Sequence, residues 1–190
     1  MHLPTINHID LSFIENFPLS GLTPSVNLHR LDIHNLTDRL EEEIVVQSEM
    51  MPKIHEFHTS GSSLVTTMLL HAKREDGRPA FNFMDLRRLS TCLEDQRNVR
   101  YLIQNAKLLE KLQLTFGCGQ SLLGLHDILS PSAHTLKVLA LTGVPNDIYY
   151  LPPRQPFQGL WEELEAMAGH NILEDLSFEA YVDFHGAEKV

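Results

Sequence analysis

Leu109-Glu110-Lys111-Leu112-Gln113-Leu114 is the stretch of sequence that decides the fold. Leucine occupies its first, fourth and sixth positions, and a polar residue occupies each of the others. Because successive side chains of a β-strand point to opposite faces, Leu112 and Leu114 share one face and Lys111 and Gln113 share the other. The stretch therefore predicts a strand with an apolar inner face and a polar outer face.

The same apolar spacing recurs along the chain, in places with a weak third member. The further copies are Ile6-Ile9-Leu11, Leu28-Leu31-Ile33, Ile54-Phe57-Thr59, Leu86-Leu89-Thr91, Leu136-Leu139-Leu141 and Leu173-Leu176-Phe178. With first positions at 6, 28, 54, 86, 109, 136 and 173, the intervals are 22, 26, 32, 23, 27 and 37 residues. Four of the six fall within the roughly 20–29 residues of a leucine-rich unit. The two longer intervals hold a charged turn at 73–79 and an irregular, proline-containing loop at 145–156.

Segments with helical periodicity lie between these copies. Val99, Leu102, Ile103 and Ala106 follow the i, i+3, i+4, i+7 pattern of an amphipathic helix. Weaker apolar stripes predict four further helices, at Leu40 and Ile44 after an Asp38 cap, at Leu64 and Met68, at Leu122, Leu125 and Leu129, and at Leu160, Leu164 and Met167. Strand and helix are thus expected to alternate once per repeat.

Units of this size cannot bury their own apolar faces, so they stack and share one continuous core. The sequence therefore predicts an α/β leucine-rich-repeat solenoid, or horseshoe, of about seven irregular repeats. A concave parallel β-sheet and helices on the convex side are expected. Because the first and last copies stand close to the chain ends, we expect a single domain over 1–190 that is a fragment or a truncated form lacking caps.

Composition narrows the class of partner. The chain has 190 residues and a net charge of −10, which disfavours nucleic acid and anionic membranes because both would repel it. No apolar stretch is long enough to span a bilayer, and the N-terminus shows no secretory signal. Cys92 and Cys118 are not spaced as a disulfide cap, which fits a reducing compartment. We expect a monomer in the cytoplasm or the nucleus, with another protein as its partner.

The stretch Leu109–Leu114, together with Ser130–Leu141, resembles the irregular repeats of F-box/leucine-rich-repeat proteins, particularly fungal ones. The resemblance covers nearly the whole chain through a short and degenerate motif. It implies that the repeats hold a substrate protein while an N-terminal F-box docks on a ubiquitin-ligase adaptor. The chain would then be a substrate-recognition region.

Two features depart from that family's pattern. The F-box itself is not evident: Leu3-Pro4 resembles its opening, but Pro18 interrupts any following helix, and Ile6–Leu11 also fits the first strand. The asparagine that closes each turn of a regular leucine-rich repeat is also missing. Its place is taken by Ile14, Leu36, Gly117 and Val144, as in the irregular subclass.

The residues between the apolar positions are expected to line the concave face. They are His8, Asp10, Ser12, Arg30, Asp32, His34, Glu56, His58, Ser60, Arg88, Ser90, Cys92, Lys111, Gln113, Thr115, Val138, Ala140, Thr142, Asp175, Ser177 and Glu179. The candidates for partner binding among them are Asp10, Arg30, Asp32, His34, Glu56, His58, Arg88, Lys111, Gln113, Val138 and Ala140. Arg30, Arg88 and Lys111 form a basic column, and Val138 and Ala140 form an apolar patch suited to an anchor on a partner.

A metal site is not expected. His8, His34 and His58 fall on three successive strands, but in different columns, and no H-x-x-x-H or C-x-x-C spacing supports them. Gly117-Cys118-Gly119 lacks the third glycine of a phosphate-binding fingerprint, and we expect no cofactor.

A competing hypothesis is an enzyme, or a small-ligand-binding α/β protein, with a cleft at the concave face. Ser12, His34 and Asp32 would form its site, or Cys92 near the basic pair at 87–88. No sharp nucleophile turn or glycine-flanked oxyanion site accompanies them. The sequence therefore favours a binding protein with no catalytic residue.

Overall fold

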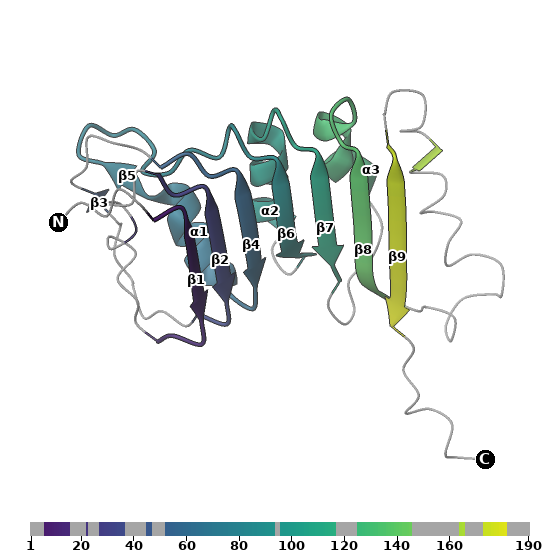
Figure 1. Ribbon diagram of the computed structural model, residues 1–190, viewed down its shortest axis with the longest axis horizontal. Coiled ribbons are helices and arrows are strands. Elements are labelled where there is room, and N and C mark those ends of the chain that lie inside the picture. The colour runs from purple at the N-terminus through teal and green to yellow at the C-terminus, as the bar shows by residue number, and fades with distance from the viewer. Residues whose placement is uncertain are drawn as a thin grey trace, which may run out of the picture.

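The computed structural model describes residues 6–15, 22, 27–36, 45–46, 52–93, 96–116, 125–145, 164–165 and 173–181. Within these ranges seven strands lie side by side in one parallel sheet, in the order in which they follow along the chain (Figure 1). They are β1 (His8–Ser12), β2 (Arg30–His34), β4 (Glu56–Ser60), β6 (Arg88–Cys92), β7 (Lys111–Thr115), β8 (Val138–Pro145) and β9 (Asp175–Tyr181). The predicted α/β class with a parallel sheet is confirmed.

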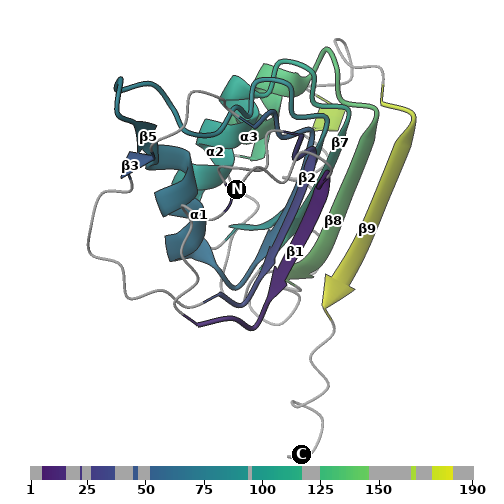
Figure 2. The ribbon, with the colours of Figure 1, turned by 60° about the vertical axis from the view of Figure 1, so that its left-hand side comes forward.

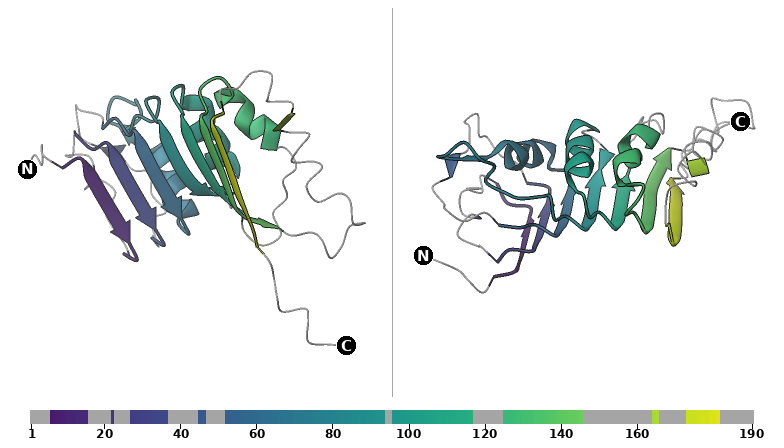
Figure 3. Two further views of the ribbon diagram at one scale, coloured as in Figure 1. Left: turned by 45° about the vertical axis from the view of Figure 1, so that its right-hand side comes forward. Right: turned by 90° about the horizontal axis from the view of Figure 1, so that it is seen from above.

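The helices lie on one side of this sheet. α1 (Ser63–His71), α2 (Gln96–Asn105) and α3 (Leu125–Leu129), which the 3₁₀ turn η3 (Ser130–Ser132) follows, occupy the crossovers between neighbouring parallel strands (Figures 2 and 3). Two short strands, β3 (Val45–Val46) and β5 (Lys73–Arg74), form a separate small sheet. The segment 73–79, predicted as a charged turn, begins with the two residues of β5, and the Gly77 amide closes the turn after them by donating to the Arg74 carbonyl at 2.8 Å.

Register sets which side chains enter the core. Each strand pairs with the next so that equivalent motif positions stand opposite one another, as Lys111 does between Arg88 and Val138. Because side chains alternate with a period of two, one set of columns faces the helices and the other faces away. The second motif position forms a continuous buried column of Leu31, Phe57, Leu89, Leu112 and Leu139, each at most 1% exposed.

The helix predicted around Val99 is present as α2, with Val99, Leu102 and Ile103 buried against the sheet. The stripe predicted for the helix at Leu64 is wrong in phase. Leu64 is 54% exposed, and the buried face of α1 starts one residue later, at Val65.

A threonine pair joins the buried face of α1 to the sheet. Thr66 of α1 is buried, and its hydroxyl oxygen lies 2.9 Å from the hydroxyl oxygen of Thr59 in β4. Thr59 is the weak third member of its copy, so the two hydroxyls satisfy each other where leucines would otherwise pack.

Several predictions lie outside the described residues. They are the helix capped by Asp38, the turn at Gly117-Cys118-Gly119, the loop over 146–156, the stripe members Leu122, Leu160 and Met167, and the side chain of Phe178.

Substitutions at two adjacent residues of β7 test whether neighbouring side chains lie on opposite faces of the sheet. Leu112→Ala should lower the free energy of unfolding by about 2–5 kcal/mol, because it opens a cavity in the buried column. Gln113→Ala, one residue further on, should change it by no more than about 0.5 kcal/mol. Urea unfolding followed by circular dichroism measures both, and equal losses would contradict the assigned faces.

Candidate interaction surface

The face of the sheet turned away from the helices carries three columns of outward residues, which we call the open face. The first column is His8, Arg30, Glu56, Arg88, Lys111, Val138 and Asp175; the second is Asp10, Asp32, His58, Ser90, Gln113, Ala140 and Ser177; the third is Ser12, His34, Ser60, Cys92, Thr115, Thr142 and Glu179. The strand pairing aligns these residues, except that the pairing of β4 with β6 ends at Thr59 and Thr91, one residue before Ser60 and Cys92. Neighbouring strands of a sheet are about 4.8 Å apart, so neighbours within a column are in reach of each other.

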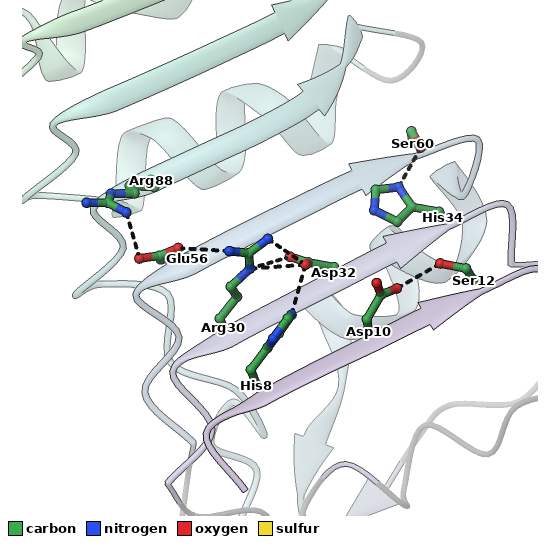
Figure 4. Close-up of polar contacts among 9 residues, drawn as sticks. All are labelled: His8, Asp10, Ser12, Arg30, Asp32, His34, Glu56, Ser60 and Arg88. Carbon is green, nitrogen blue, oxygen red and sulfur yellow. Dashed lines mark hydrogen bonds and ion pairs between the residues drawn. The ribbon is translucent and has the colours of Figure 1, made fainter.

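Asp32 is the centre of an ionic network on this face (Figure 4). The Arg30 guanidinium donates to both carboxylate oxygens, with Nη2 2.8 Å from Oδ2 and Nε 3.1 Å from Oδ1. His8 Nε2 lies 2.9 Å from the same Oδ2. Although Asp32 points outward, these two side chains cover it, and it is only 4% exposed.

The network keeps Asp32 ionised. Burial alone would raise the pKa of its carboxyl group, but the hydrogen bonds from Arg30 and His8 outweigh burial and lower it below its usual range. The same hydrogen bond raises the pKa of Arg30. Asp32, which the sequence marks as a partner-binding candidate, therefore holds Arg30 in place and has little surface left for a partner.

The charges alternate further along the first column. Glu56 lies between two arginines, with its Oε2 3.8 Å from Arg30 Nη1 and its Oε1 3.1 Å from Arg88 Nη1. Lys111 comes next in the column, on the exposed start of β7. Across the part of the chain that the structure describes, no carboxylate pairs with Lys111, so the row of alternating charges ends at a cation.

A shallow hollow of about 140 Å³ opens among these side chains. It is lined by Arg30, Glu56, His58, Arg88, Leu89, Ser90, Lys111 and Gln113. Burial lowers the pKa of His58, so its imidazole is neutral at neutral pH. Its Nε2 is buried and has no hydrogen-bond partner among the described residues. The hollow therefore joins three cationic side chains, a carboxylate and an unsatisfied ring nitrogen.

Val138 and Ala140 lie beside the cationic end of the hollow. Val138 pairs with Lys111 and Ala140 with Gln113, and both are partly exposed. The apolar patch that the sequence predicts is thus adjacent to the basic residues that it predicts.

The residues of the competing catalytic hypothesis are not brought together. The Ser12 hydroxyl donates to Asp10 at 2.7 Å, and His34 Nδ1 lies 2.8 Å from Ser60 Oγ. Asp32 is engaged by Arg30 and His8, so it does not orient His34 (Figure 4). Cys92 and Arg88 stand at opposite ends of β6, about 13 Å apart at the usual strand rise.

Sequence reasoning missed a histidine pair just before the strands. His29 and His55 precede β2 and β4, and their Nδ1 atoms lie 2.8 Å apart. Burial and the neighbouring His29 lower the pKa of His55. The signal was present, because the two residues are 26 positions apart, the same interval that separates their strands.

Within the described ranges, no cluster of three or more His, Cys, Asp or Glu side chains could hold a metal ion. None of the helices in those ranges has the length and apolar character needed to cross a membrane.

Comparison with protein-family models, curated proteins and solved structures gives no match. The residues of the open face therefore carry the functional inference.

A pair of isosteric variants tests the role of Asp32. Asp32→Asn should lower the free energy of unfolding by about 1–2 kcal/mol, a value moderated because Arg30 is partly exposed. Asp10→Asn, in the same column on exposed β1, should cost less than about 0.5 kcal/mol. Chemical denaturation at neutral pH compares them, and equal effects would show that Asp32 does not organise the network.

The two histidines with lowered pKa predict a pH dependence. In the unfolded chain they titrate near the usual value of about 6.5, so the unfolded state binds protons first as the pH falls. The free energy of unfolding should therefore decrease from about pH 7 downward through that value. His55→Gln/His58→Gln should flatten this part of the curve. An unchanged slope in the double variant would contradict the burial of these imidazoles.

Proposed function

We propose that this chain is a leucine-rich-repeat solenoid that binds another protein on its open face, as the substrate-recognition region of an F-box/leucine-rich-repeat ubiquitin-ligase adaptor does. The observation that carries the proposal is the open face itself. Seven in-register strands align its side chains in three columns, and those columns hold an ionic network, a hollow and an apolar patch. A mixed polar surface with a small apolar centre suits selective protein recognition.

The stacking of the strands supports the repeat class. The first motif positions Leu28, Ile54, Leu86, Leu109 and Leu136 are each 0% exposed, and they stand in successive crossovers of one parallel sheet. Equivalent residues of successive units thus share one core, as stacked repeats require. The spacing of 22–27 residues between most copies is the length of a leucine-rich unit.

Preorganisation supports binding. Arg30 and Glu56 are held by their neighbours before any partner arrives, so little side-chain ordering would oppose association. The net charge of −10 disfavours nucleic acid and anionic membranes, which leaves a protein as the partner. The chain would act as a monomer in the cytoplasm or the nucleus. Its ligase role requires an F-box in a longer form of the chain.

Retention of a protein by the open face tests this function. The tagged chain is incubated with an extract of its source, beside a variant that places two large cations on the open face, Ser90→Arg/Ala140→Arg. A convex variant, Arg97→Glu/Arg100→Glu on α2, is the control. A partner should be retained by the native chain and the convex variant and lost by the open-face variant. Retention by the open-face variant, or loss only with the convex variant, would contradict the proposal.

A further inference from the structure

We propose that the hollow of the open face binds a carboxylate of an acidic protein segment, held between Arg88 and Lys111, with an apolar residue of the same segment on Val138 and Ala140. The inference rests on the proposed function, since it names the chemistry of the partner that the open face takes. The positive charge of the hollow is the first observation that supports this carboxylate site.

The local charge differs in sign from that of the whole chain. Overall the chain carries −10, yet the hollow is lined by Arg30, Arg88 and Lys111 against the single carboxylate of Glu56. Asp32, just outside it, is the partner of Arg30. Three cations thus face two carboxylates, which leaves one positive charge at the Lys111 end. A basic hollow on an acidic protein selects an anionic group from solution.

Arg88 and Lys111, at the cationic end of the hollow, have hydrogen-bond donors that no described residue engages. Arg88 contacts Glu56 through Nη1, and no other contact of its guanidinium is found among the described residues. Lys111 pairs with Arg88 across the strands, so its ammonium and the guanidinium start from neighbouring backbone positions. A carboxylate between them can accept from both, and such charge-assisted hydrogen bonds are stronger than neutral ones.

Polar groups complete the hollow behind these cations. Ser90 and Gln113 are partly exposed in the second column, and in the described part of the chain neither makes a side-chain hydrogen bond. The buried Nε2 of His58 also lacks a partner there. A bound anion and its accompanying water can satisfy groups that the protein leaves unpaired.

The charge balance favours a carboxylate over a phosphate. One surplus positive charge matches the single charge of an aspartate or glutamate side chain. A phosphorylated side chain carries about −1.5 to −2 at neutral pH. Glu56, on the wall of the hollow, would repel the second negative charge of a phosphate, and no surplus cation would be left to offset it.

The position of the apolar patch predicts a second feature of the ligand, an apolar residue close to its carboxylate. Val138 follows Lys111 in the first column, and Ala140 follows Gln113 in the second. A segment that places its carboxylate between Arg88 and Lys111 therefore lays a neighbouring residue on β8. An apolar residue at that place would bury surface against Val138 and Ala140.

The test is a nuclear magnetic resonance titration of the full chain, labelled with ¹⁵N, with three short synthetic peptides. They share valine-rich flanks and differ at the centre, which is glutamate, glutamine or phosphoserine. The glutamate peptide should produce saturable shift changes centred on Arg88, Ser90, Lys111 and Gln113. The glutamine peptide should bind at least about tenfold more weakly, because it lacks the charge.

Two variants of equal charge locate the site. Lys111→Gln should weaken binding of the glutamate peptide about tenfold, whereas Lys107→Gln, beyond the end of α2 and off the open face, should leave it unchanged. Glu56→Gln should improve binding of the phosphoserine peptide more than that of the glutamate peptide. Tighter binding of phosphoserine than of glutamate by the native chain would overturn the choice of carboxylate.

Failure of this inference is distinguishable from failure of the proposed function. No saturable shift at millimolar glutamate peptide, or equal affinity for the glutamine peptide, overturns the carboxylate site. A native partner lost with Ser90→Arg/Ala140→Arg but bound by Lys111→Gln with unchanged affinity also overturns the carboxylate site, while leaving protein binding at the open face intact.

Discussion

Parallel pairing in register is the constraint on which the rest of this structure depends. Because side chains alternate along a strand, pairing in a common register aligns equivalent residues of the seven strands in columns. The columns on one face of the sheet are mainly apolar, and those on the other face are mainly polar. The core and the open face are therefore consequences of one arrangement. A shift of one residue in β7 would place Lys111 and Gln113 against the helices and expose Leu112 and Leu114.

Within that frame, the open face is organised by charge. A carboxylate that is 4% exposed, Asp32, holds Arg30; Arg30 and Arg88 flank Glu56; and the series ends at Lys111. The protein is acidic as a whole, but this sequence of contacts leaves a positive end beside the apolar pair Val138 and Ala140. Such an arrangement would offer the proposed partner both an electrostatic and an apolar contact, and the sheet fixes the spacing between the two.

The strands and the three columns could be predicted from the sequence because both follow from a period of two. The burial of Asp32 could not, since it depends on His8, 24 residues away in the chain, and on the conformation of the Arg30 side chain. The phase of α1 was missed because two apolar pairs, Leu64 with Met68 and Val65 with Leu69, have the same helical spacing, and spacing alone does not choose between them. Side-chain contacts within and between the strands and helices decide the burial that periodicity leaves open.

Cysteine accessibility along β7 tests the central claim most directly. In a chain with Cys92→Ser and Cys118→Ser, residues 111 to 114 are each replaced by cysteine in turn, and the rate of reaction with a thiol reagent is measured under native conditions. The register predicts fast reaction at 111 and 113, on the open face, and strong protection at 112 and 114, in the core. Similar rates at all four positions, or the opposite alternation, would contradict the in-register sheet and the face built on it.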